Sequence, residues 1–187
     1  ALPIYSHGKP SAPVLLVPVD IEQNHSGYSL DELLARGEID ALIGSRKPAS
    51  LGRHPDVARL FPDFRRLERE MFIKEKIFPI MHVIALRRDF HERNPWVANS
   101  LFRAFVESKQ LAQERLRYAG SLCTMLPWQI EEMAEVDEVF DGDAFPYGIE
   151  ANRPTLEALM RHMVEQNFIA KPIPLEELFL KTPGRSE

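Results

Sequence analysis

An apolar run at residues 78–88 constrains the fold of this chain more than any other feature. Its sequence, FPIMHVIALRR, has the length and the β-branched content of a buried strand. Before the two closing arginines, its single ionisable side chain is that of His82. Burying an imidazole costs free energy unless the ring gains a partner. We therefore expect His82 either to hold a hydrogen bond in the core or to face a cleft.

A second segment, near the start of the chain, is typical of an α/β protein. Ser29 and Glu32 have the spacing of a capping box, and Gly37 is a natural stop for the helix that the box begins. Residues 39–43 then predict a short buried strand. Ligands of α/β folds collect beyond the carboxyl ends of strands, which points to the loop at residues 44–48.

The later half of the chain is predicted to be mostly helical. Apolar residues recur there at helical spacing, and prolines mark helix starts. The expected helices lie at about 64–74, 95–118, 127–139, 154–166 and 174–179. The expected strands lie at 14–19, 39–43 and 78–88. Because unpaired strands seek partners, we expect these few strands to pair with residues outside this chain or in a second copy, which predicts a homo-oligomer.

The composition is that of a soluble globular protein and argues against several classes of function. Of the 187 residues, 44% are hydrophobic and 27% are charged. The net charge is −5, with no basic cluster beyond Arg87 and Arg88 and scattered helical arginines, which disfavours nucleic-acid binding. No stretch approaches the roughly 20 apolar residues of a membrane span. No signal peptide is visible, so a cytoplasmic location is expected. The single cysteine, Cys123, excludes an internal disulfide.

The sequence predicts neither a metal site nor a cofactor. The histidines are dispersed and form no His-x-x-x-His pattern. Residues 141–143, Asp-Gly-Asp, predict a turn but lack the remaining ligands of a calcium loop. The chain also has no glycine-rich phosphate loop and no Gly-x-Ser-x-Gly nucleophile turn.

Two cations, Arg46 and Lys47, follow the strand predicted at residues 39–43. An arginine binds a carboxylate well because its planar guanidinium bonds both oxygens at once. On the residues alone, however, two solvated loop cations are the better interpretation.

A third unusual segment, residues 145–153, has the sequence FPYGIEANR and precedes a predicted helix. Gly148 is expected to adopt a backbone conformation that other residues resist. Asn152 is predicted to cap the helix that follows. Because a helix N-terminus also suits an anion, capping and carboxylate binding are compatible at Asn152.

Tyr147 and Arg153 in the same segment each have two interpretations. The Tyr147 ring either contacts a ligand or packs within the loop. The Arg153 guanidinium either binds a carboxylate ligand or forms a salt bridge with Glu150 or Glu157.

Together, the segments at 37–43, 78–88 and 145–153 resemble the 4,5-dihydroxyphthalate decarboxylase family. The resemblance runs from about Tyr28 to Phe179 and matches the later part of the family chain. It implies an α/β fold of the type II periplasmic-binding-protein-like kind, with two lobes around a cleft. That fold would be incomplete here, because the first portion of the family chain is absent from this sequence.

The resemblance also implies two domains. Residues 1–77 would form part of the α/β lobe, with a strand and the ligand loop. Residues 78–187 would form a crossover strand and the helical part of the other lobe.

The implied function is non-oxidative decarboxylation of a hydroxylated aromatic dicarboxylate such as 4,5-dihydroxyphthalate, a step of phthalate degradation. Such a reaction needs cations that hold the carboxylates and an acid that protonates the ring carbon. His82 and Arg46 are implied as catalytic residues, the first as proton donor and the second as carboxylate clamp. The residues implied in substrate binding are Lys47, Tyr147, Asn152 and Arg153. The alternative is a solute-binding protein that takes up a small aromatic carboxylate without catalysis, because one fold can host both functions.

Overall fold

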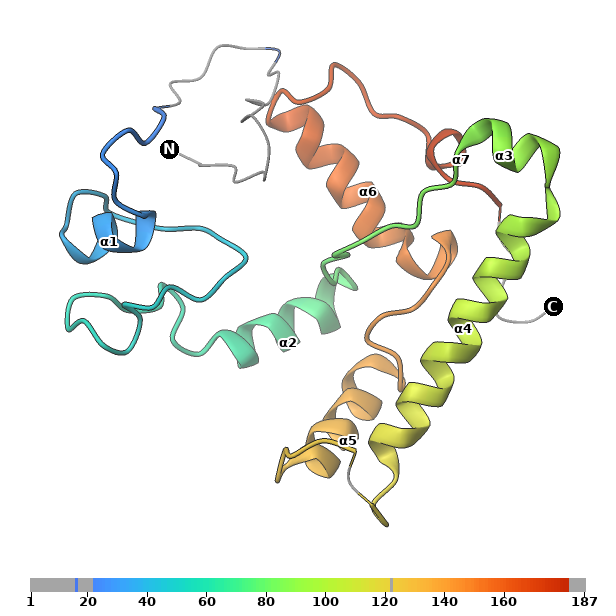
Figure 1. Ribbon diagram of the computed structural model, residues 1–187, viewed down its shortest axis with the longest axis horizontal. Coiled ribbons are helices and arrows are strands. Elements are labelled where there is room, and N and C mark those ends of the chain that lie inside the picture. The colour runs from blue at the N-terminus through green and yellow to red at the C-terminus, as the bar shows by residue number, and fades with distance from the viewer. Residues whose placement is uncertain (1–15, 17–21, 122, 182–187) are drawn as a thin grey trace. The chain divides into compact units, whose positions relative to one another are not determined.

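The computed structural model describes residue 16, residues 22–121 and residues 123–181, and within them it contains seven helices and no β-strand (Figure 1). The chain divides into two compact units. The first unit is Ala1–Leu67 with Asn167–Ala170, and the second is Glu68–Gln166 with Lys171–Glu187. The division falls inside a helix and lies earlier than the boundary expected after residue 77. The α/β fold of the family stays a prediction.

In the first unit, helix α1 (Leu30–Ala35) begins as the sequence predicts. The amide of Ser29 donates to the Glu32 carboxylate at 2.7 Å, and the amide of Glu32 donates to the Ser29 hydroxyl at 3.2 Å. The capping box is therefore confirmed, and it satisfies two amide groups that have no partner inside the helix.

The end of α1 is also set by local chemistry. Gly37 has a φ of +71°, a left-handed conformation that favours glycine. The amides of Gly37 and Glu38 donate to the carbonyls of Leu34 and Leu33 at 3.1 and 2.9 Å. This pair of bonds is a Schellman motif, so the predicted glycine stop is confirmed.

The strand predicted at residues 39–43 does not form in the described part of the chain. These residues are bends and irregular backbone, and the side chain of Ile43 is 82% exposed. The physical reason is that a strand exists only through its ladder, and no described segment forms one with these residues. Apart from residue 16, the strand predicted at 14–19 lies outside the described residues.

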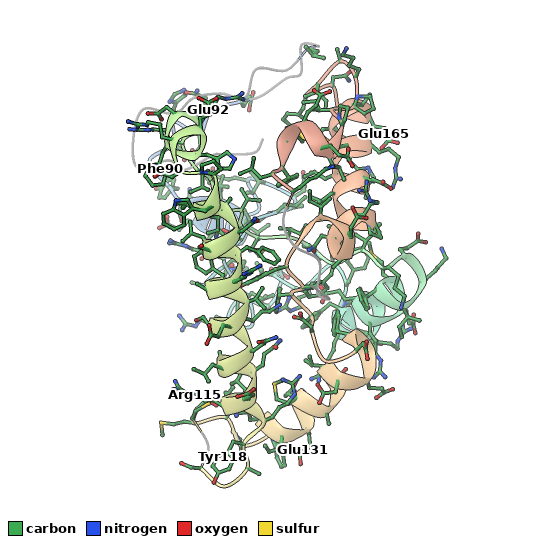
Figure 2. All side chains as sticks on the ribbon, turned by 90° about the vertical axis from the view of Figure 1, so that its right-hand side faces the viewer. Phe90, Glu92, Arg115, Tyr118, Glu131 and Glu165 are labelled. Atoms are coloured by element: carbon green, nitrogen blue, oxygen red, sulfur yellow. The ribbon has the colours of Figure 1, made fainter. Side chains whose placement is uncertain are left out.

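The remaining helices account for most of the second unit. They are α2 (Phe64–Glu75), which contains the division between the units, α3 (Arg88–Arg93), α4 (Trp96–Arg117), α5 (Gln129–Phe140), α6 (Ile149–Glu165) and α7 (Leu175–Leu178). Helix α4 packs against α3 and α5, and α6 packs against α7. In Figure 2, Phe90 and Glu92 of α3 lie beyond one end of α4, whereas Glu131 of α5 lies near its other end.

The helix predictions are confirmed for α2, α4, α5 and α7, whose ends lie within two residues of those expected. Helix α3 was not predicted, because its six residues are too few to show an apolar period. Helix α6 begins at Ile149 rather than at Pro154, which lies inside the helix. The proline has no N–H to donate to the carbonyl of Glu150, four residues before it.

Four phenylalanines form an aromatic cluster in the second unit. Phe72 of α2 lies 4.4 Å from Phe140 of α5 between ring centroids, and Phe78 lies 5.0 Å from Phe140. Phe78 also contacts Phe145, at 5.4 Å. The hydroxyl of Thr155 on α6 accepts from the Phe78 amide at 3.1 Å and donates to its carbonyl at 3.2 Å. These contacts tie the start of the run at 78–88 to α2, α5 and α6.

Beyond Phe78, the run is neither a strand nor buried, contrary to the sequence prediction. Figure 1 shows this segment as irregular backbone, neither helix nor strand, between α2 and α3. Met81, Val83 and Ile84 are 69%, 65% and 67% exposed. The reason is the same as for residues 39–43, because the described part of the chain supplies no strand to pair with the run.

The buried apolar core of the described residues is small. The buried hydrophobic residues are Leu33, Val57, Leu156, Ala158 and Leu175. A domain of ordinary size buries far more apolar side chains than these. None of the helices in the described ranges has the length and apolar composition that crossing a bilayer requires.

Candidate functional site

The loop at residues 143–148, between α5 and α6, is held by side chains from both of its sides. On the α6 side, the amide group of Asn152 donates to the carbonyls of Pro146 and Gly148, at 2.7 and 2.8 Å. Asn152 lies in the first turn of α6, so the prediction that its side chain caps the helix is wrong. The N-cap position belongs to Gly148, whose φ of +98° confirms the conformation expected for it.

On the α4 side, Lys109 reaches the same loop. Its ammonium lies 2.7 Å from the Asp143 carboxylate, 2.9 Å from the Phe145 carbonyl and 4.2 Å from the centroid of the Tyr147 ring. The Lys109 and Asp143 side chains are only 15% and 7% exposed. The other oxygen of Asp143 accepts from the Phe145 amide at 3.2 Å and from Gln113 at 3.3 Å. A largely buried ion pair therefore fixes the loop to α4.

Tyr147 lies in this braced loop, and the residue is 41% exposed. The structure thus brings together two predicted site residues, because Asn152 holds the loop carbonyls on both sides of Tyr147. Sequence reasoning missed Lys109 and Asp143, because they lie 34 residues apart and form no local motif. The turn predicted at 141–143 is confirmed by positive φ angles of 53° at Asp141 and 81° at Gly142.

Arg153 lies one residue beyond Asn152 on α6 and is surrounded by carboxylates. Its guanidinium lies 2.7 Å from Glu150, 3.1 Å from Glu176 and 3.6 Å from Glu157. The hydrogen bond to Glu150 is the main cause that raises the pKa of Arg153, and the same bond lowers the pKa of Glu150. The salt bridges that competed with ligand binding in the sequence interpretation are both formed.

A hollow of about 440 Å³ lies beside Arg153, between α6 and the segment that leads into α7. Its apolar lining includes Met160, Val164, Ile173 and Leu175. Its charged lining comprises Arg153, Arg161, Glu157, Glu165 and Glu176. Because the carboxylates outnumber the arginines, this hollow does not favour a dicarboxylate ligand.

His82 lies in the exposed run between α2 and α3. Within the described ranges, its imidazole forms no hydrogen bond or ion pair. The structure therefore gives His82 neither the core hydrogen bond nor the enclosed position that a buried strand would have provided, and its catalytic role stays a prediction.

Arg46 and Lys47 lie in the first unit, on an exposed loop. The residues that follow are tied to α1, because the Asp31 carboxylate accepts from the amides of Ala49 at 2.9 Å and Ser50 at 3.2 Å. The hydroxyl of Ser50 also donates to Asp31, and this bond is the main cause that lowers the pKa of that carboxyl. Asp31 is a positioning group that sequence reasoning did not identify.

The predicted site residues are divided between the two units. Arg46 and Lys47 belong to the first unit, whereas His82, Tyr147 and the two residues on α6 belong to the second. The expected convergence of Arg46 and His82 on one substrate stays a prediction. Among the residues that the structure describes, no three His, Cys, Asp or Glu side chains gather as metal ligands would.

No family model matches the chain. The chain is 30% identical over 154 residues to the 4,5-dihydroxyphthalate decarboxylase of Comamonas testosteroni. The matched region covers 82% of this chain and 47% of that enzyme, so the chain spans about half the length of this relative. The similarity establishes a distant relationship to a decarboxylase.

Proposed function

We propose that this chain acts in the non-oxidative decarboxylation of a hydroxylated aromatic dicarboxylate such as 4,5-dihydroxyphthalate. The observation that carries the proposal is the 30% sequence identity, over 82% of the chain, to a 4,5-dihydroxyphthalate decarboxylase.

The reaction has a simple balance. The bond between a ring carbon and one carboxylate breaks, the electron pair stays on the ring carbon, that carbon takes up a proton, and CO2 leaves. The product is an aromatic monocarboxylate that keeps both hydroxyls. A ring hydroxyl helps the ring accept the proton, so the protein must chiefly position the substrate and deliver the proton.

Three predicted residues have side chains available for these tasks. In the part of the chain that the structure describes, His82, Arg46 and Lys47 are engaged in no hydrogen bond or ion pair. We assign proton delivery to His82 and carboxylate binding to Arg46, with Lys47 beside it.

The two predicted residues on α6 are less available. The Asn152 amide already holds two loop carbonyls, and the Arg153 guanidinium already faces three carboxylates. A substrate carboxylate at Arg153 would have to displace one of those carboxylates. We therefore assign ring contact to Tyr147 and a supporting role to Asn152.

The test is incubation of the chain with 4,5-dihydroxyphthalate, with unsubstituted phthalate as the substrate control. Release of CO2 and formation of the monocarboxylate are measured together. Release from the hydroxylated compound alone is expected, because only its ring hydroxyls help the ring take up the proton. Absence of CO2 from both compounds would refute the proposed activity.

Variants assign the roles. His82→Gln is expected to lower kcat by about 100-fold or more, the usual contribution of a general acid. His25→Gln, which changes another exposed histidine, is the matched control and should leave kcat unchanged. Arg46→Gln is expected to raise KM, because it removes a cation from substrate binding. Unchanged kcat in His82→Gln would remove that residue from the mechanism.

The same samples decide the alternative of a solute-binding protein. Tight binding of the hydroxyphthalate in a calorimetric titration, with the compound recovered intact, would favour binding without catalysis.

A further inference from the structure

Tyr147 is held in place by the backbone on both sides of it. The carbonyl of Phe145 accepts from Lys109, and the carbonyls of Pro146 and Gly148 accept from Asn152. Three of the four carbonyls at residues 145–148 are therefore fixed by side-chain donors. Gly148 supplies the turn in the backbone that this arrangement needs, with its φ of +98°. These bonds hold the backbone on both sides of Tyr147 in a defined conformation.

The Lys109 ammonium has three N–H groups, and the structure contains an interaction partner for each of them. Two hydrogen bonds go to Asp143 and Phe145, and the face of the Tyr147 ring lies 4.2 Å away. A cation at this distance from a ring centroid is attracted to the ring electrons. Because its donors are occupied, Lys109 has no free donor for a ligand and acts through the groups that it holds.

The carboxylate of Asp143 is also fully engaged in hydrogen bonds. Its carboxylate accepts from Lys109, from Gln113 and from the Phe145 amide. With 7% of its side chain exposed, it neutralises the ammonium where water does little to screen either charge. The pair thus fixes both the start of the loop and one face of the ring.

We propose that Lys109, together with Asp143, is the positioning residue for Tyr147, and that the exposed part of the Tyr147 ring holds the aromatic ring of the ligand. The second half of this proposal rests on the proposed function. The ammonium against one face of the ring withdraws electron density from the other. The exposed part of the ring then suits contact with an electron-rich aromatic compound, the class to which a hydroxylated phthalate belongs.

The first experiment needs no ligand. Tyrosine rings are labelled with ¹³C in the 187-residue chain, and the Tyr147 signals are assigned with Tyr147→Phe. Lys109→Met is expected to move the Tyr147 ring signals and leave those of Tyr28 and Tyr118 in place. Unmoved Tyr147 signals in a folded Lys109→Met variant would overturn the positioning role.

A matched control lies on the same helix. Arg117 also ties α4 to the region before the loop, through Asp137 at 2.5 Å and the Gly142 carbonyl at 2.8 Å. Arg117→Gln removes these bonds without touching Tyr147, so it should leave the Tyr147 signals unchanged. Movement of the signals by the same amount in Arg117→Gln would mean that the loop responds to any loss on α4, and this too would overturn the proposal.

A second variant keeps the test valid if Lys109→Met does not fold. Lys109→Met leaves the carboxylate of Asp143 without its cation, which can prevent folding by itself. The double change Lys109→Gln with Asp143→Asn removes both charges and keeps side chains of similar size. It should fold and still move the Tyr147 signals, because the cation against the ring is gone. Unmoved signals in this folded double variant count against the proposal as well.

The ligand half is tested by a double-mutant cycle on the affinity for 4,5-dihydroxyphthalate, measured by calorimetry. Lys109→Met should weaken binding by about tenfold in the wild-type background and by less than about twofold in the Tyr147→Ala background. Equal losses in both backgrounds would show that Lys109 does not act through Tyr147. A chain that still turns over substrate with undiminished affinity in Tyr147→Ala would refute the ring contact and leave the proposed function standing. If the wild-type chain neither binds nor turns over the compound, the ligand half and the proposed function fail together, and the ring signals still decide the positioning role.

Discussion

The loop at 143–148 and the run at 79–87 lie in the same unit, each connects two helices, and the sequence marks both as functional candidates. The two segments differ in how many side chains fix their backbone. The loop is braced by Lys109, Asp143 and Asn152, two of them largely buried. The run is anchored at its entry, where Thr155 bonds both backbone groups of Phe78, and at its end, where the Arg87 carbonyl accepts from amides of α3.

The difference follows from what each segment needs. A polar turn needs a few donors and acceptors, which side chains of the neighbouring helices can supply. An apolar extended run needs a whole row of backbone partners on at least one side, and only another strand can supply it. The loop is therefore complete within its own unit, whereas the run leaves Val83 and Ile84 about two-thirds exposed.

Hydrogen exchange should show the largest contrast. Amides of residues 80–86 are expected to exchange roughly a thousand times faster than amides in the middle of α4, because they lack the ladder and the helix amides open only with wider unfolding. Exchange followed by mass spectrometry at several protein concentrations measures this ratio. Slow exchange in residues 80–86 that appears only at high concentration would instead support the predicted homo-oligomer, and sedimentation would identify it.

The second prediction concerns the ion pair beneath the loop. Asp143→Ala is expected to lower the free energy of unfolding by about 3–5 kcal/mol, because it leaves the Lys109 ammonium buried without its carboxylate. Urea denaturation measures the change. Asp137→Ala is the matched control, since Asp137 pairs with Arg117 but is 49% exposed, and it should lower the free energy of unfolding far less than Asp143→Ala does. Similar losses in the two variants would mean that the buried pair is no stronger than an exposed one.

The features that the sequence predicted correctly depend on neighbours in the chain. The capping box of Ser29 and Glu32, the stop at Gly37 and the conformation of Gly148 are each set within a few residues. The long helices were also predictable, because their apolar period persists over several turns. These features cover much of the fold as described.

The features that it missed or mispredicted depend on distant parts of the chain. The ion pair between Lys109 and Asp143 joins residues 34 positions apart, and no local sequence pattern predicts it. The apolar period at 78–88 is compatible with a strand, but it does not say whether a pairing strand exists. For the candidate site, the sequence therefore predicted Tyr147 and Asn152 as residues of interest and missed Lys109 and Asp143, which fix the loop to α4.

The third prediction tests the backbone of the loop. Gly148→Ala is expected to cost about 1–3 kcal/mol of the free energy of unfolding, because alanine must adopt the φ of +98° that only glycine tolerates well. Gly44→Ala is the control, since a Cβ at Gly44 meets nothing within 4 Å and its φ is not in the left-handed region. Thermal unfolding of both variants measures the difference. A loop that is flexible rather than braced would relax around the alanine, and Gly148→Ala would then resemble the control.

The smallest effect should come from Arg153, whose carboxylate partners are exposed. Its hydrogen bond is the main cause that lowers the pKa of Glu150 below the ordinary value of 4.5. The pKa of Glu176 is lowered mainly by a backbone hydrogen bond and, after it, by the hydrogen bond with Arg153. A carboxyl whose pKa is lower in the folded state stabilises the fold above its unfolded pKa, and this contribution is lost as the pH falls through the folded value. The urea midpoint of the wild-type chain should therefore fall more steeply between about pH 6 and about pH 3 than that of Arg153→Gln.

The same titration separates a structural Arg153 from a ligand-binding one. If the guanidinium serves α6 and α7 alone, saturating 4,5-dihydroxyphthalate should leave the difference between the two pH profiles unchanged. If the substrate carboxylate takes the guanidinium from Glu150 and Glu176, their pKa values should return toward the ordinary range, and the ligand should flatten the wild-type profile toward that of Arg153→Gln. We expect the unchanged difference, because three carboxylates already surround this cation, whereas Tyr147 on the braced loop keeps an exposed ring.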